Sequence, residues 1–186
     1  MNQKIIVSTD TKSELQKIWE KHEIKKVFVV CDAAFSYLET HEEYLDMNIP
    51  YVVFDKFTPN PLYEDVAVGV KLFKEQGCDA ILAVGGGSSI DCSKAIAAAV
   101  KYDGDVWDMT TDWSLMQDAL PVFVVSTMAA TGSEMDAYAV ITKTETNEKK
   151  DLGGEPVIPK FSILDPKFTY SVPKFQTAAG AADIIS

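Results

Sequence analysis

The chain has 186 residues, of which 47% are hydrophobic and 24% are charged, and this balance is typical of a globular domain with a sizeable core. No segment is long and apolar enough to span a membrane and no signal peptide is visible, so we expect a cytoplasmic protein without a membrane partner. The formal net charge of −11 argues against a nucleic-acid partner, although a helix N-terminus can bind a phosphate even in an acidic protein.

Short β-rich runs alternate with longer amphipathic segments along the first two thirds of the chain. The runs lie at 4–8, 25–32, 50–55, 79–84 and 120–127, and the segments between them at 13–22, 33–45, 62–77 and 89–102. Several runs are continuously apolar, as strands covered on both faces must be. Val66, Val70 and Phe73 recur at helical spacing before Gly77, a typical helix cap. The pattern predicts an α/β fold with a parallel, Rossmann-like sheet and helices on both faces.

The alternation changes after Ser126. Residues 138–166 are typical of a β-hairpin-like excursion with a polar tip, and residues 177–186 begin like a helix. The sequence stops inside this last element. Because a helix needs its apolar face covered, we expect further protein after Ser186 in the intact molecule, or a frayed end.

The cysteines and histidines do not suggest a metal site. Cys31, Cys78 and Cys92 are an odd, scattered set without a CxxC pair, so we expect buried, reduced thiols. His22 and His41 lie in polar stretches, where solvated helix faces suit them better than metal binding or acid/base catalysis.

The stretch AILAVGGGSSIDCSKAIAAAV places three glycines and two serines between a strand and a helix. Glycine permits positive φ and close approach of a ligand to the backbone, and Ser88 or Ser89 can cap the helix while its first N–H groups point outward. A diphosphate fits this arrangement, and the alternative is a tight turn without a ligand. The stretch matches neither GxGxxG nor the P-loop pattern, so its spacing alone does not identify a cofactor.

Asp32 closes the run VFVVCD, at the carboxyl end of a neighbouring predicted strand. An acid at such a position can accept hydrogen bonds from a ribose 2′-hydroxyl and repel a 2′-phosphate. A helix cap for the following segment explains the same residue equally well. Both interpretations stay open on the residues alone.

Four separated motifs resemble those of the iron-containing (group III) alcohol dehydrogenases, in the same order and spacing. They are GGGSSIDCSKAIA, TPNP at 58–61, STMAATGSEMDAYAVIT at 126–142 and ILDPKFTYSVPKFQTAAGAAD at 163–183. The last one is similar to the butanol-dehydrogenase-like branch. The resemblance covers nearly the whole chain and is far more specific than a glycine loop alone.

The resemblance implies a dinucleotide-binding α/β domain over 1–179 and, at 180–186, the start of a helical metal-binding domain that is otherwise absent from this chain. Asp91 and Lys94 match the Asp and Lys of the family on the helix behind the glycine loop. The cofactor-binding residues that the resemblance implies are Asp32, Asn60, Gly85, Gly86, Gly87, Ser88, Ser89, Asp91, Thr127, Met128, Thr131 and Lys149. Met128 stands where the family has a threonine, which removes a hydroxyl near the cofactor.

The metal site of the family is incomplete in this sequence. Family members bind a divalent ion, iron or zinc, with one Asp and three His; Asp183 matches the Asp, and the three histidines are missing. One carboxylate does not hold a catalytic divalent ion, so we expect the chain as given to bind no metal and to be inactive.

The resemblance implies the cofactor-binding half of a metal-dependent dehydrogenase that transfers hydride between NAD(P) and a small alcohol or aldehyde. Asp32 occupies a position that tends to be acidic in NAD users, which favours NAD and leaves NADP open. The alternatives are a stand-alone nucleotide-binding or regulatory module, and an enzyme like glycerol dehydrogenase or dehydroquinate synthase. An exposed sheet edge and the apolar face meant for the missing domain are the two candidate surfaces for a homodimer.

Overall fold

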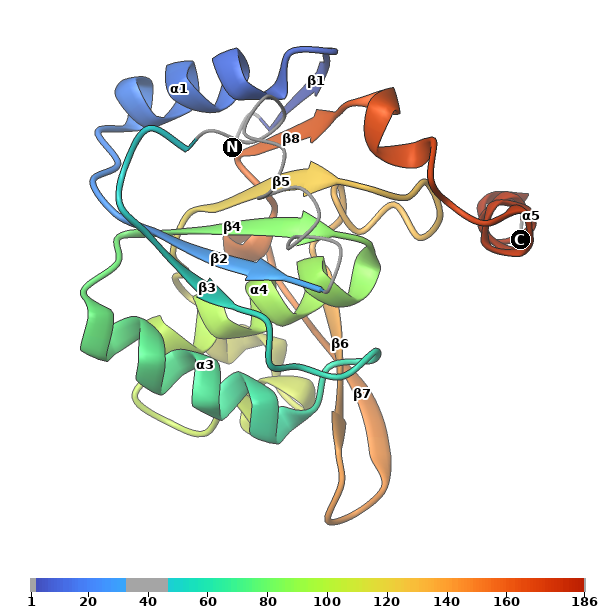
Figure 1. Ribbon diagram of the computed structural model, residues 1–186. Helices are drawn as coiled ribbons and strands as arrows, with labels where there is room; N and C mark the ends of the chain where they lie inside the picture. Colours follow the sequence, from blue (N-terminus) through green and yellow to red (C-terminus); the bar gives the residue numbers. More distant parts are fainter. Residues whose placement is uncertain (1–2, 33–46, 186) are drawn as a thin grey trace.

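The computed structural model describes residues 3–32 and 47–185. Six strands form one parallel sheet in the order β1-β8-β5-β4-β2-β3 (Figure 1). The strands are β1 (Lys4–Val7), β2 (Val27–Cys31), β3 (Tyr51–Phe54), β4 (Ala80–Gly85), β5 (Val122–Ser126) and β8 (Phe161–Leu164). All five predicted apolar runs are strands of this sheet, so the predicted parallel α/β fold is confirmed.

Helices cover both faces of the sheet, as predicted. Helix α1 (Thr11–His22) packs on one face, and α3 (Tyr63–Gln76) with α4 (Gly87–Lys101) on the other (Figure 1). The fully buried strand β2 divides its side chains between the two cores, with Val29 toward α1 and Phe28 toward α3 and α4. The helix predicted over 33–45 lies outside the described residues.

Helix α1 starts two residues before the predicted segment because Asp10 caps it. The Asp10 carboxylate accepts a hydrogen bond from the backbone N–H of Ser13 at 3.2 Å, which satisfies one of the open donors of the first turn. Leu15, Ile18 and Trp19 recur at helical spacing and are buried against the sheet. The helix is therefore fixed at its start by a polar cap and along its length by one apolar face.

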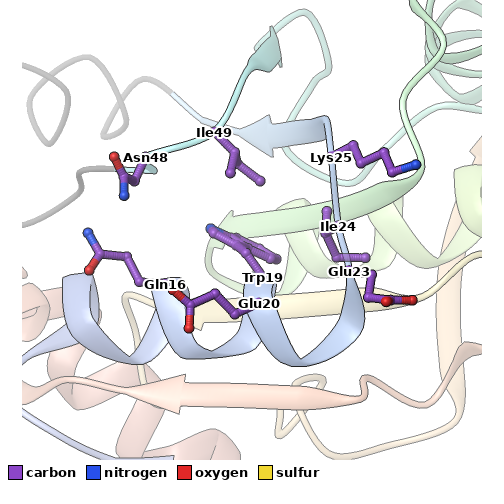
Figure 2. Close-up of a pocket in the computed structure, with 8 residues that line it drawn as sticks. All are labelled: Gln16, Trp19, Glu20, Glu23, Ile24, Lys25, Asn48 and Ile49. Carbon is purple, nitrogen blue, oxygen red and sulfur yellow. The ribbon is translucent and has the colours of Figure 1, made fainter.

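Trp19 borders a hollow of about 390 Å³ between α1 and the segments that lead into β2 and β3 (Figure 2). Ile24 and Ile49 form its apolar part. The indole Nε1 of Trp19 is buried and has no hydrogen-bond partner within 3–32 and 47–185. This hollow lies at the amino ends of the strands, away from the glycine turn.

Helix α3 has the predicted apolar face and cap. Val66 and Phe73 are buried, Val70 packs against the same core, and Gly77 ends the helix with φ at +63°. Its N–H donates to the carbonyl of Phe73 at 3.1 Å. Glycine at this position permits the left-handed backbone without a Cβ penalty.

The predicted hairpin is confirmed only in its first half. β6 (Tyr138–Lys143) and β7 (Glu148–Gly153) pair antiparallel around a polar tip, in which Asn147 has a φ of +52°. The remainder of the predicted excursion is wrong, because Phe161–Leu164 is β8, a central strand between β1 and β5. Figure 1 shows the hairpin projecting from the sheet on the side of α3 and α4.

Short 3₁₀ turns connect the remaining elements, at Val106–Thr110, Trp113–Leu115, Glu155–Val157 and Pro166–Thr169. The last helix, α5 (Lys174–Ile185), begins three residues before the predicted segment and stands apart from the sheet (Figure 1). Phe175 and Ile185 on this helix are 79% and 85% exposed. Among the described helices none has the length and apolar character needed to cross a bilayer.

The cysteine prediction is confirmed, because all three side chains are buried and none forms a disulfide among the described residues. His22 is exposed at the end of α1 as predicted, although its ring also packs edge-on against Phe123 and Phe161. His41 lies outside the described residues.

Candidate cofactor-binding site

The glycine turn joins the carboxyl end of β4 to the start of α4, and its glycines serve different purposes. Gly85 has a φ of +150°, and a Cβ there would lie 2.3 Å from the hydroxyl of Ser89, so the fold itself requires glycine. At Gly86 a Cβ would meet no described atom closer than the Cβ of Met128, at 3.9 Å. Packing therefore does not require glycine at position 86, and its absent side chain leaves the backbone open to a ligand.

The N-terminus of α4 lacks a side-chain cap within the described part of the chain. The prediction that Ser88 or Ser89 caps this helix is wrong. The helix begins at Gly87 with Gly86 as its N-cap residue, so both serines lie inside the first turn. The N–H groups of an uncapped first turn point along the helix axis and carry the positive end of its dipole, which suits an anion.

The TPNP turn lies beside the glycine turn. The backbone N–H of Asn60 donates to the hydroxyl of Ser88 at 3.2 Å, and the ammonium of Lys149 on β7 donates to Oδ1 of Asn60 at 3.1 Å. Asn60 adopts a φ of +62°, which asparagine tolerates better than most residues. The fold thus brings together three predicted residues that are 28 or more positions apart and adds an exposed positive charge at the turn.

The loop after β5 forms the opposite side of the site. The N–H of Thr127 donates to the carbonyl of Gly85 at 3.0 Å. Oγ1 of Thr131 would lie 3.0 Å from a Cβ placed on Gly87, so Gly87 permits this close approach. Met128 faces Gly86 across the turn. The three predicted residues of this loop therefore flank the three glycines.

A hollow of about 290 Å³ continues from this loop along the carboxyl ends of β5 and β8. Ser126, Met128, Leu164 and Asp165 are among its lining residues. Ser126 pairs with Gly85 in the sheet, so the hollow adjoins the glycine turn. Its position at the carboxyl edge of a parallel sheet is where ligands of such folds bind.

Asp32 follows β2, the strand next to β4, and its Oδ2 would lie 3.4 Å from a Cβ on Gly85. The exposed carboxylate thus reaches the glycine turn, as its predicted role requires. The segment that it would cap as an alternative starts at 33 and lies outside the described residues.

Ser89 lies behind the same turn, where its buried hydroxyl has no hydrogen-bond partner among the described residues.

Asp91 is held within the protein. Its two carboxylate oxygens accept hydrogen bonds from the hydroxyl of Ser133 and, at 3.1 Å, from the N–H of Val140. Burial raises the pKa of Asp91, and these two hydrogen bonds lower it in part. Asp91 connects α4 to the start of β6, and its predicted part in cofactor binding stays a prediction.

Lys94, one turn further along α4, is fully buried. Its ammonium donates to Oδ1 of Asp136 at 2.6 Å, to the carbonyl of Asp136 at 3.0 Å and to that of Tyr138 at 2.8 Å. Sequence reasoning missed Ser133 and Asp136 as partners of this helix. Both lie in the 126–142 motif, but only the fold shows which polar residue of α4 each of them contacts.

Asp183, the predicted metal ligand, lies on the exposed face of α5. Gly180 fixes the approach of this helix to the site, since a Cβ there would lie 2.4 Å from the carbonyl oxygen of Ala129. Over 3–32 and 47–185 no group of three or more His, Cys, Asp and Glu side chains is placed to hold a metal ion.

A family model for iron-containing alcohol dehydrogenases matches residues 2–166. The chain belongs to this family. NADH-dependent butanol dehydrogenase A of Clostridium acetobutylicum is 52% identical over 139 residues, which are 75% of this chain and 36% of that protein. The NADPH-dependent aldehyde reductase YqhD of Escherichia coli is 41% identical over 133 residues, or 70% of this chain and 34% of the reductase.

Solved structures of family members have the same fold. A butanol dehydrogenase A from Thermotoga maritima has a TM-score of 0.91 and 34% identity, and the match covers 98% of this chain and 47% of that one. Sulfoacetaldehyde reductase of Bifidobacterium kashiwanohense, solved with NAD⁺, has a TM-score of 0.92 and 28% identity over 99% of this chain and 50% of the reductase. This family member therefore spans about half the length of its solved relatives.

Proposed function

We propose that this chain is the dinucleotide-binding part of an NAD-dependent alcohol dehydrogenase. The observation that carries the proposal is the glycine turn, where the uncapped N-terminus of α4 faces an open backbone at Gly86. The first-turn N–H groups would bind the pyrophosphate of the cofactor, because they offer hydrogen bonds and a positive dipole end to an anion. Lys149, whose ammonium donates a hydrogen bond to Asn60, would add a positive charge that attracts the pyrophosphate.

The two sides of the turn would take the two ends of the dinucleotide. Asp32 stands at the end of β2, where its carboxylate can accept hydrogen bonds from the adenosine ribose. The hollow beside Met128 and Leu164 would hold the nicotinamide end, which accepts or donates hydride when the cofactor is bound. Thr127 and Thr131 line the path between these ends and orient the cofactor.

A carboxylate at position 32 favours NAD over NADP, because it repels a 2′-phosphate. The relatives from Clostridium acetobutylicum carry NADH in their names, and the more distant Escherichia coli reductase carries NADPH. Small alcohols or aldehydes are the proposed substrate class, since the relatives are named for butanol, 1,3-propanediol and aldehydes.

The described residues do not fit the metal that the family implies. Asp183 is an exposed carboxylate, and catalytic divalent ions need three or more protein ligands. The chain as given should bind cofactor without turning over substrate.

The test is a calorimetric titration of the chain with NAD and with NADP, followed by an assay with butanol or butyraldehyde in the presence of iron or zinc. We expect saturable binding of NAD, weaker binding of NADP and no turnover. A chain that is folded by circular dichroism but binds neither dinucleotide at millimolar concentration would contradict the proposal. Turnover by the chain alone would contradict the expected inactivity but not the proposed cofactor site.

A further inference from the structure

The hollow at the carboxyl ends of β5 and β8 has a wall made of two segments that are far apart in the sequence. Val7, at the end of β1, belongs to one segment, and Pro166 with Thr169, in the 3₁₀ turn Pro166–Thr169, belongs to the other. β1 and β8 lie on the far side of β5 from β4 in the sheet, so this wall is the part of the hollow farthest from the glycine turn. We call it the outer wall.

Asp165 connects the two segments of the outer wall. It is only 2% exposed, and it also lines the hollow. Its Oδ2 accepts a hydrogen bond from the hydroxyl of Thr11, the buried first residue of α1, at 3.0 Å, and its Oδ1 accepts from the backbone N–H of Lys167 at 3.0 Å. The ammonium of Lys167 in turn donates to the carbonyl of Thr9 at 2.6 Å. The start of α1 and the loop before it are therefore tied to the 3₁₀ turn by two side chains.

A cap for the 3₁₀ turn explains only part of this arrangement. Asp105 and Asp112 cap two other 3₁₀ turns by the same bond to the N–H two residues further on, and both are exposed. A carboxylate loses favourable hydration when it is buried, so the burial of Asp165 is costly unless specific contacts offset it. The bond to Thr11, 154 residues away, is such a contact. It fixes α1 relative to the turn, which capping alone does not require.

The outer wall lies where the proposed cofactor would end. Gly85, Ser126 and Leu164 are register partners in neighbouring strands, so they form one row along the carboxyl edge of the sheet. Neighbouring strands are about 4.8 Å apart, which places Leu164 about 10 Å from the glycine turn. Asp32 reaches the same turn from the opposite side. A dinucleotide with its pyrophosphate at the turn and its adenosine ribose at Asp32 therefore directs its nicotinamide ring to the hollow beside Leu164.

We infer that Asp165 is a positioning residue for the nicotinamide ring, because it holds the outer wall in place through Thr11 and the 3₁₀ turn. This inference rests on the proposed function. Hydride transfer requires the ring to be held in one orientation, and a rigid wall restricts the orientations that it can adopt. Phe168, on the same turn, is buried in the core that α1 covers, so the turn stays folded without the Thr11 bond. Loss of the bond should loosen the wall and leave the fold intact.

ADP-ribose is the probe that isolates this effect, because it has the adenosine, the pyrophosphate and both riboses of NAD but lacks the nicotinamide ring. Thr11→Val removes the hydroxyl and keeps the shape of the side chain. We expect this variant to bind NAD about fivefold more weakly than the wild type, as loss of one hydrogen bond to a charged group implies, and to bind ADP-ribose with unchanged affinity. Thr11→Ser keeps a hydroxyl at this position and should retain the wild-type affinity for NAD. Calorimetry measures both ligands.

Thr111→Val is the matched control, because the Thr111 hydroxyl donates to the carbonyl of Asp108 at the end of another 3₁₀ turn. It should change the affinity for neither ligand. Asp165→Asn is a second variant, which keeps an acceptor for the N–H of Lys167 and should weaken NAD binding relative to ADP-ribose as Thr11→Val does. It decides the question if circular dichroism shows that Thr11→Val does not fold.

The deciding quantity is the ratio of the NAD and ADP-ribose dissociation constants. A ratio that rises in Thr11→Val and Asp165→Asn but not in Thr11→Ser supports the inference. The same ratio in the wild type and in both of the first two variants would overturn it, while binding of ADP-ribose would still support the proposed cofactor site. A folded wild type that binds neither ligand would contradict the proposed function and the inference together.

Discussion

The hydroxyl of Ser88, in the first turn of α4, accepts a hydrogen bond from the backbone N–H of Asn60 at 3.2 Å and so connects the glycine turn to the TPNP turn. We predict that Ser88→Ala lowers NAD affinity about threefold to tenfold and changes the free energy of unfolding by less than about 1 kcal/mol, because the bond is exposed. Calorimetry and urea unfolding measure the two quantities.

Lys149→Met tests whether Ser88 acts through the position of Asn60. Lys149 holds the same residue by its side chain, at 3.1 Å. If both residues act only by positioning the TPNP turn, their effects on NAD affinity should not add in the double variant, whereas loss of the Lys149 charge beside the pyrophosphate would add to the effect of Ser88→Ala. Additive losses would show that Ser88 and Lys149 contribute independently to cofactor binding.

Gly86→Val should abolish dinucleotide binding in a folded chain. A Cβ at this position meets only ordinary contacts, and the backbone is in an extended conformation that valine accepts. Gly85→Ala is the contrasting variant: it forces a Cβ toward Ser89 at a φ of +150° and should cost about 1–3 kcal/mol of stability. Thermal unfolding with NAD titration separates the two outcomes, and unchanged NAD affinity in Gly86→Val would refute the role of the turn.

Asp32→Gly should shift the preference from NAD toward NADP by about tenfold or more, since removing the carboxylate removes repulsion of the 2′-phosphate. Asp55→Gly is a suitable control, because Asp55 follows β3 just as Asp32 follows β2. The ratio of the two dissociation constants is the quantity to measure. If the ratio changes equally in both variants, the shift toward NADP results from the change in net charge and not from the position of Asp32.

The sequence predicted most of the sheet because parallel strands covered on both faces must be apolar throughout, as VFVV and ILAV are. It did not predict β8, whose four residues follow a polar and proline-containing stretch. Pairing with β5 and β1 places Phe161 and Ile163 in the core that α1 covers. The predicted start of α4, at Ser89, was two residues too late, because serine is a better helix cap than glycine by propensity. In the structure the tight turn at Gly85 determines where the helix begins.

The site was predicted to the extent that its residues lie in recognisable motifs. Asn60, Ser88 and Lys149 are distant in sequence, and only the fold shows that Asn60 contacts both of the others. Asp91 and Lys94 occupy motif positions too, yet their hydrogen bonds go to the start of the hairpin. A motif thus identifies residues that matter without distinguishing ligand contacts from internal supports.

Lys94→Met should destabilise the fold by about 3 kcal/mol, because it removes a buried ammonium from three acceptors at the start of the hairpin. Lys101→Met is the control on the same helix, where an exposed pair with Asp118 at 3.6 Å is worth no more than about 1 kcal/mol. Urea unfolding measures both variants. Equal losses of unfolding free energy in the two variants would mean that the burial of Lys94 does not determine how much it stabilises the fold.

Asp91→Asn should change the pH dependence of stability. The pKa of Asp91 is raised in the folded state, so the folded protein holds this proton more tightly than the unfolded chain does. The resulting contribution to stability is present at acid pH and is lost as the pH rises through the folded-state pKa. Asparagine can still accept from the N–H of Val140 and has no charge to bury.

The stability difference between Asp91→Asn and the wild type should therefore be smallest near the unfolded-state pKa of 3.8, grow in favour of the variant as the pH rises, and level off above the folded-state pKa. Urea unfolding at a series of pH values from about 4 to 8 gives this difference directly. A difference that stays constant with pH would mean that Asp91 has the same pKa in both states, and that Ser133 and Val140 fully compensate for its burial.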